Sequence, residues 1–185
     1  MIEETLFEAE AKMEQAIGHL QAQFATVRTG RANPALLHRV MVDYYGSSTP
    51  LQQLASFSVP EPRMLLVHPY DRSSIGVVER AILASDLGLN PSNDGTVIRL
   101  AFPPLTEERR RELIRLVRHM AEETRVAVRN VRRDVISDFK DLKKEGEISE
   151  DDEHRAEEEV QKLTDGFIEK INDLLHHKEE EILEI

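Results

Sequence analysis

The chain has 185 residues, which is enough for one domain of ordinary size or for two small ones. It contains no cysteine, so disulfides and thiolate metal sites are excluded, and no apolar run approaches the roughly 18 residues of a membrane-spanning helix. The acidic amino terminus lacks the basic and apolar regions of a signal peptide, and we therefore expect a soluble cytoplasmic protein with no membrane partner.

The net charge of -11 is distributed unevenly along the chain. Residues 106–144 hold 12 Lys and Arg against 8 Asp and Glu, a local charge of +4, whereas residues 145–185 hold 4 against 16, a local charge of -12. A positive segment in an acidic protein predicts a surface for a polyanion such as RNA. The acidic carboxyl-terminal segment is unsuited to that contact.

Residues 2–28 predict a first long helix, because apolar side chains recur every three or four residues. These side chains are Leu6, Ala9, Met13, Ala16, Leu20, Phe24 and Val27. Gly30 accepts the left-handed backbone that a helix stop needs, and Pro34 discourages a restart of the helix.

Residues 31–105 are richer in Pro and Gly and predict a small α/β module. HRVMVDYYG and TPLQQLASFSV each read as a strand with a tight turn at Gly46-Ser47 between them, and RMLLVHPY and GTVIRLAF read as two more strands. SSIGVVERAILASDLG predicts a helix that stops at Gly88. Tyr44 and Tyr45 fit either the module core or a stacked nucleic-acid base, and core packing is the favoured interpretation.

Residues 106–145 predict a second long helix, roughly 60 Å in length at about 1.5 Å per residue. Its predicted inner stripe consists of Leu113, Val117, Met120, Thr124, Val128, Val131, Val135, Phe139 and Leu142. A second stripe of arginines at helical spacing is centred roughly 120° away on the same helix and is therefore expected to face solvent. Its members are Arg111, Arg115, Arg118, Arg125, Arg129 and Arg132.

This arginine stripe has two interpretations. It can be an RNA-binding edge, because arginine binds phosphate with two parallel hydrogen bonds and also stacks on bases. It can instead be a solvated helix face whose arginines pair with Glu108, Glu122 and Asp134. The RNA-binding interpretation is favoured.

Ser149 followed by acidic residues predicts the start of a third helix, which continues close to the carboxyl end. Its apolar face consists of Ala156, Val160, Leu163, Phe167, Ile171 and Leu174. The predicted fold class is therefore α+β, with an antiparallel three-helix bundle of residues 1–30 and 106–185 and an inserted α/β domain of residues 31–105. The short connection between the second and third helices favours packing within one chain, so we expect a monomer.

Two chain connections join the inserted domain to the bundle, at 29–31 and 103–106. A double connection restricts motion to a hinge-like swing. The candidate hinge residues are Thr29, Gly30, Pro103, Pro104, Leu105 and Thr106.

No set of residues for catalysis or for cofactor binding is present in the sequence. There is no GxxxxGK phosphate loop, no nucleophile elbow and no HExxH motif. His154, His176 and His177 match no metal-ligand spacing, and the acidic run EISEDDE lacks the spacing of a calcium loop. We therefore expect no enzyme activity, no metal and no cofactor.

Eight motifs resemble those of the bacterial ribosome recycling factor family, in the same order and spacing along the whole chain. They are RTGRANP at 28–34, VDYYG at 42–46, PLQQLAS at 50–56, SDLGLNP at 85–91, PPLTEERR at 103–110, RVAVRNVRRD at 125–134, EISEDD at 147–152 and VQKLTD at 160–165. His68 departs from the more ordinary strand residue that the resemblance predicts, and it puts no motif in doubt.

The resemblance implies an L-shaped protein of tRNA size that binds between the subunits of the 70S ribosome after termination. It implies that the factor acts with elongation factor G, which hydrolyses GTP, to split the subunits and free the ribosome from mRNA. The bundle would lie along large-subunit ribosomal RNA, and the α/β domain would face elongation factor G. The implied RNA-binding residues are Arg28, Arg31, Arg110, Arg129, Arg132 and Arg133, with Arg111, Arg115, Arg118 and Arg125 as weaker candidates.

A competing hypothesis is a coiled-coil interaction protein whose arginines are only solvated. Salt dependence distinguishes the two, because binding that neutralises phosphates weakens steeply as salt rises.

Overall fold

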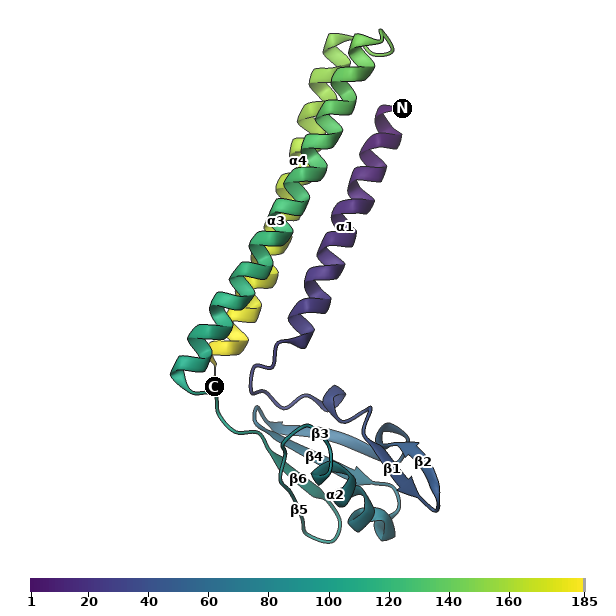
Figure 1. Cartoon of the computed structure of the whole chain (residues 1–185), viewed down its shortest axis with the longest axis vertical. Helices are drawn as coiled ribbons and strands as arrows, with labels where there is room; N and C mark the ends of the chain where they lie inside the picture. The colour runs from purple at the N-terminus through teal and green to yellow at the C-terminus, as the bar shows by residue number, and fades with distance from the viewer. Residues whose placement is uncertain (185) are drawn as a thin grey trace. The chain divides into compact units, whose positions relative to one another are not determined.

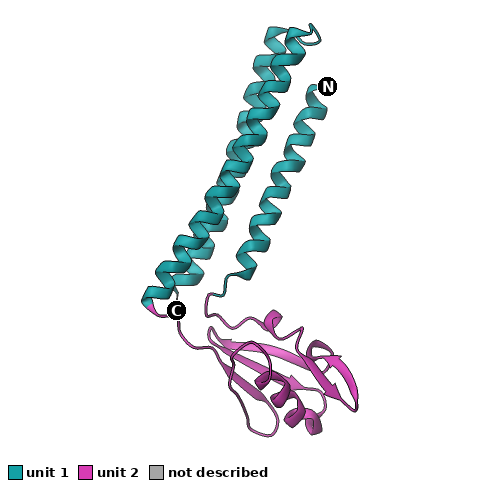
Figure 2. Cartoon of the chain, viewed as in Figure 1, with its two compact units in different colours: residues 1–28, 107–184 teal, residues 29–106, 185 magenta. Residues whose placement is uncertain are grey.

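The computed structural model describes residues 1–184. The described chain forms two compact units (Figure 2). One unit comprises Met1–Arg28 and Glu107–Glu184, and the other comprises Thr29–Thr106.

The first unit is a bundle of three helices, α1 (Ile2–Thr26), α3 (Glu107–Lys144) and α4 (Glu150–Leu183). Helices α1 and α4 run in the same direction, and α3 runs opposite to both (Figure 1). The predicted α+β fold class is confirmed, as are the positions of the three long helices to within two residues. Helix α1 ends two residues earlier than predicted, because Val27 already has extended backbone with φ -80 and ψ 110.

The loop between α3 and α4 is closed by local hydrogen bonds at both ends. Gly146 has φ 78, and its N–H donates to the carbonyl of Lys143 while the N–H of Glu147 donates to Leu142, each at 3.0 Å. This pattern is a Schellman motif, which satisfies the last carbonyls of a helix. Ser149 then begins α4 as predicted, with a capping box in which its hydroxyl accepts from the Asp152 N–H at 3.1 Å.

Apolar side chains from all three helices fill the interior of the bundle. Six of the nine residues predicted for the inner stripe of α3 are buried, namely Leu113, Val117, Thr124, Val128, Val135 and Phe139. Met120 is only half-buried, and Ala121 takes the interior position instead. The reason is angular, because Ala121 lies four residues after Val117 and seven before Val128, close to the centre of the stripe.

The second unit contains a four-stranded antiparallel sheet in the order β3-β4-β6-β5. Its strands are β3 (Ala55–Glu61), β4 (Met64–Pro69), β5 (Pro91–Asn93) and β6 (Ile98–Ala101). A separate hairpin pairs β1 (Met41–Tyr44) with β2 (Ser47–Pro50), and the helix α2 (Ile75–Leu83) contacts β1 and β5. The core of this unit is lined by Leu37, Val42, Leu51, Leu65, Val67, Val78, Ile82, Ile98 and Leu100.

Three predictions for this unit need correction. TPLQQLASFSV is not one strand, because a 3₁₀ turn at Leu51–Gln53 buries Leu51 and separates β2 from β3. Gly88 does not stop the helix, since α2 ends at Leu83 and the hydroxyl of Ser85 caps the carbonyl of Ile82 at 2.6 Å. The strand β5 was not predicted, because three residues beginning with proline carry no alternating pattern.

The hairpin turn lies at Tyr45-Gly46, one residue before the predicted position. Both residues have positive φ, 50 for Tyr45 and 80 for Gly46, as a two-residue type I′ turn requires. Tyr45 is 81% exposed, so the prediction of core packing is wrong for this residue. The turn conformation places it at the hairpin tip, where its hydroxyl reaches Asp71 at 3.4 Å.

Among residues 1–184, no helix combines the length and apolarity needed to cross a membrane.

Candidate nucleic-acid interface

Three arginines of the predicted stripe form hydrogen bonds from α3 to side chains of α4. They are Arg118, Arg125 and Arg132, spaced by seven residues. Seven residues make nearly two helical turns, so the three side chains leave α3 on one line. Their partners on α4 appear in descending order of residue number, because the two helices are antiparallel.

Arg118 has an acidic partner. Its Nε donates to Glu179 Oε1 at 2.5 Å, and the side chain of Glu179 is only 20% exposed while that of Arg118 is 64% exposed. The carboxylate offsets the positive charge of the guanidinium directly. Arg118 therefore presents less uncompensated positive charge than its place in the stripe predicts.

Arg125 and Arg129 share one carboxylate. Glu122 accepts from Arg125 Nη1 at 2.9 Å and from Arg129 Nη1 at 3.1 Å, and these two hydrogen bonds lower the pKa of Glu122, that from Arg125 most. Arg125 also donates to the amide oxygen of Asn172 on α4, at 2.8 Å from Nη2. The single negative charge of Glu122 pairs with two positive guanidinium groups, so this cluster of three side chains keeps a net positive charge.

Arg132 has a neutral partner. Its Nη1 donates to Gln161 Oε1 at 2.9 Å, and Gln161 Nε2 in turn donates to Asp165 Oδ1 at 2.7 Å. The guanidinium is held in place without a carboxylate in contact with it. Its Nε and Nη2 groups make no hydrogen bond to residues 1–184, so they remain available as donors to an external oxygen.

The two remaining arginines of the stripe, Arg111 and Arg115, and the further candidate Arg133 are exposed on α3. Arg111 pairs with Glu107, one turn earlier. Arg115 and Arg133 are exposed and form no hydrogen bond or ion pair within the described residues. Of the three acidic partners expected on α3, which are Glu108, Glu122 and Asp134, only Glu122 pairs with arginines within residues 1–184.

The three RNA-binding candidates nearest the chain connections differ in how exposed they are. Arg28 and Arg31 are exposed, as an RNA contact requires. Arg110 is half-buried, and its Nε atom is buried with no hydrogen-bond partner among residues 1–184. A buried donor without a partner is rare in folded proteins. Arg110, which the resemblance implies as an RNA-binding residue, is therefore less accessible than Arg28 and Arg31.

The candidate hinge residues flank two backbone anchors within the α/β unit. The N–H of Ala32 donates to the carbonyl of Pro62, and the N–H of Phe102 donates to the carbonyl of Arg63, both at 2.8 Å. Entry and exit of the chain are thus fixed at the same turn between β3 and β4. The residues outside these anchors belong to no helix or strand, and they are Thr29, Gly30, Pro103, Pro104, Leu105 and Thr106.

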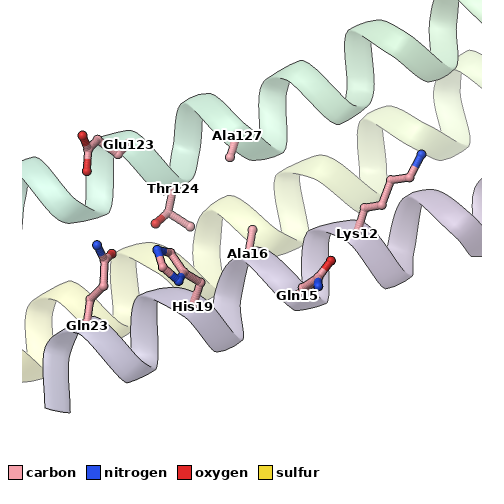
Figure 3. Close-up of a pocket in the computed structure, with 8 residues that line it drawn as sticks. All are labelled: Lys12, Gln15, Ala16, His19, Gln23, Glu123, Thr124 and Ala127. Atoms are coloured by element: carbon pink, nitrogen blue, oxygen red, sulfur yellow. The ribbon is translucent and has the colours of Figure 1, made fainter.

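Sequence reasoning missed a groove between α1 and α3, of about 430 Å³ (Figure 3). His19 and Gln23 of α1 and Thr124 of α3 point into it, with Ala16 and Ala127 at its sides. The small side chains of Ala16 on α1 and Ala127 on α3 leave this space open. The two residues are far apart in the sequence, so no local pattern predicts that they line one groove. Its rim mixes Lys12 with Glu123 and offers no run of positive charge for phosphates.

The histidines of α4 do not form a metal site. His176 Nε2 lies 3.2 Å from Glu180 Oε1, and no group of three His, Asp or Glu side chains in residues 1–184 is arranged to hold a metal ion.

A three-helix bundle, an inserted α/β unit and a row of arginines on one helix define an α+β protein with a basic helix edge. The chain belongs to the ribosome recycling factor family, because the family model described as Ribosome recycling factor matches residues 20–183. The chain is 59% identical to the ribosome-recycling factor of Rubrobacter xylanophilus over 180 residues, which is 97% of each protein. It is 55% identical to that of Carboxydothermus hydrogenoformans over 185 residues, the full length of both.

Two solved structures are similar over nearly the whole chain. A solution structure of the ribosome recycling factor covers 100% of this chain and 98% of its own, with a TM-score of 0.74 and 44% identity. The second is of the T. thermophilus ribosome recycling factor with E. coli elongation factor G bound to the E. coli post-termination complex. It covers 99% of both chains with a TM-score of 0.65 and 48% identity.

Proposed function

We propose that this protein recycles ribosomes after termination. Acting with elongation factor G, which hydrolyses the GTP, it splits the post-termination ribosome into subunits and frees it from mRNA for a new round of translation. The observation that carries this proposal is the family match over residues 20–183. A related factor has been placed with elongation factor G on a post-termination complex, which supports the same partners here.

The edge formed by Arg125, Arg129, Arg132 and Arg133 is the proposed contact to large-subunit ribosomal RNA. Its support is electrostatic, because Arg132 has only a neutral partner, Arg133 has none within residues 1–184, and Arg125 and Arg129 share one carboxylate. Phosphate oxygens can therefore bind Arg132 and Arg133 without displacing a carboxylate, and at Arg125 and Arg129 they compete with a single carboxylate, that of Glu122. Such contacts read the shape and backbone of RNA rather than its base sequence.

The two connections at 29–31 and 103–106 are the proposed hinge. The hydrogen bonds of Ala32 and Phe102 to the same turn keep the α/β unit intact during such a motion. The φ of 77 at Gly30 places one connection in a conformation that glycine adopts freely. Within this proposal the protein acts as a cytoplasmic monomer and needs no cofactor of its own.

Subunit splitting tests the proposed function. Post-termination ribosomes are mixed with elongation factor G, GTP and this protein, and the decrease in light scattering reports dissociation of the subunits. We expect this protein to raise the splitting rate well above that with elongation factor G alone, and to lose this effect when a non-hydrolysable GTP analogue replaces GTP. A splitting rate equal to that with elongation factor G alone contradicts the proposal.

A further inference from the structure

Arg132, Gln161 and Asp165 form a chain of side chains from α3 to α4. Arg132 Nη1 donates to the amide oxygen of Gln161 at 2.9 Å, and the amide nitrogen of Gln161 donates to Asp165 Oδ1 at 2.7 Å. Asp165 lies four residues after Gln161 on α4, where the two side chains meet on one helix face. The carboxylate accepts only, so it fixes the donor end of the amide toward itself and the acceptor end toward Arg132.

The hydrogen-bond partner of Arg132 on α4 differs in charge from that of Arg118. Arg118 meets the carboxylate of Glu179 directly, whereas Arg132 meets the amide of Gln161, which in turn donates to the carboxylate of Asp165. An ion pair orders an arginine and also offsets its charge. An amide orders the arginine and leaves its charge in place.

We propose that Gln161 is a positioning residue for Arg132, holding its guanidinium ready for an RNA phosphate, and that Asp165 sets the orientation of Gln161. This inference rests on the proposed function, and specifically on RNA binding by Arg132. Pre-ordering removes part of the rotamer entropy that a free arginine loses on binding. Only Nη1 is bound to the chain, so Nε and Nη2 supply the two parallel donors of a bidentate phosphate contact.

A reciprocal exchange of amide and carboxylate tests the proposal. In the double variant Gln161→Glu/Asp165→Asn, the residue at 161 still accepts from Arg132, and the amide at 165 donates to it. The net charge and the number of hydrogen bonds are unchanged, but a carboxylate now contacts Arg132. Binding of the full-length variant to purified large ribosomal subunits is measured across a range of salt concentrations. Thermal unfolding followed by circular dichroism checks that the bundle is intact.

The exchange should weaken binding roughly tenfold at low salt, as expected when one charge-assisted phosphate contact is lost. The slope of log affinity against log salt should become shallower by about 0.7 to 0.9, the value of one phosphate contact. The single variant Gln161→Ala removes the positioning and keeps the charge, so it should weaken binding while the salt slope stays as in the wild type. A structural role alone would not separate these two variants by slope.

The variant Arg132→Gln is the reference for losing the contact. If it weakens binding and the double exchange binds like the wild type with the same slope, the positioning role of Gln161 is overturned and RNA binding by Arg132 stands. If Arg132→Gln itself binds like the wild type, the inference falls together with the RNA contact at that position. The splitting rate of the wild-type protein then decides separately whether the recycling function stands.

Discussion

Glu179 Oε1 lies 2.5 Å from Arg118 Nε, which joins the α4 and α3 helices at the end of the bundle where α3 begins. Arg118 is a member of the arginine stripe that the sequence predicts, yet the ion pair with Glu179 offsets its positive charge. The stripe is therefore not uniform. Positive charge without a paired carboxylate is found mainly in the second half of α3, where Arg132 and Arg133 form no ion pair within residues 1–184.

Replacing this carboxylate by an amide should add a phosphate contact. In Glu179→Gln the side chain can still accept from Arg118, but the guanidinium keeps its full charge. We expect tighter binding to large subunits at low salt and a salt slope steeper by about 0.9 or less. Asp173→Asn, which removes a carboxylate on α4 that pairs with no arginine of α3 in the described residues, controls for the change in net charge. Equal salt slopes for the two variants would show that Arg118 lies away from the RNA.

Arg132→Lys separates charge from geometry at the proposed RNA contact. Lysine keeps the positive charge and a similar helix propensity, but it lacks the planar fork that binds phosphate through two donors. We expect subunit splitting to slow several-fold while the salt slope of binding stays nearly unchanged. Normal splitting by Arg132→Lys, together with slow splitting by Arg132→Gln, would leave a simple charge contact at this position.

The capping box at the start of α4 should support the stability of the bundle. Ser149→Ala removes the hydroxyl that accepts from Asp152 N–H, and an N-cap of this kind contributes about 1 kcal/mol. In a protein of this size the melting temperature should fall by about 2–4 °C. Ser137→Ala, at an exposed position inside α3, is the matched control and should not lower the melting temperature. An equal decrease in both variants would assign the effect to something other than the cap.

Asp71 gives the α/β unit a pH-dependent contribution to stability. Hydrogen bonds from Ser73, first from its hydroxyl and then from its N–H, lower the pKa of Asp71, and the hydroxyls of Tyr44 and Tyr45 add to this effect. A carboxyl whose pKa is lower in the folded state stabilises the fold at neutral pH, and this contribution is lost as pH falls from the ordinary aspartate range through the lowered pKa.

The variant Asp71→Asn should therefore be less stable than the wild type at neutral pH, and the difference should shrink as the pH is lowered below about 4. The difference in unfolding free energy between the two proteins is measured by urea unfolding at a series of pH values, followed by the fluorescence of the three tyrosines. A difference in unfolding free energy that stays constant with pH would mean that the negative charge of Asp71 does not contribute to stability.

The periodic parts of this protein could be predicted from sequence, and the contacts between helices could not. The helix α3 follows from the spacing of Leu113, Val117 and Val128, because a 3.6-residue period is a local property. Whether an arginine meets Glu179, Asn172 or Gln161 depends on the antiparallel register of α3 against α4, which the whole core sets. Tyr45 shows the same limit, since its aromatic ring suggests a core residue until the positive φ of the turn is known.

Gly30→Ala tests the proposed hinge. Gly30 has φ 77, and an alanine in left-handed backbone costs roughly 1–2 kcal/mol, so the change strains this connection and narrows its range of motion. Gly46→Ala is the matched control, because Gly46 has φ 80 in the β1–β2 turn and an added Cβ would meet no other atom within 4 Å. The two variants should lose similar stability in thermal unfolding, but only Gly30→Ala should slow subunit splitting by elongation factor G. If both variants split ribosomes at the wild-type rate, flexibility at Gly30 is not part of recycling, and the motion must be sought at Pro103 and Pro104 instead.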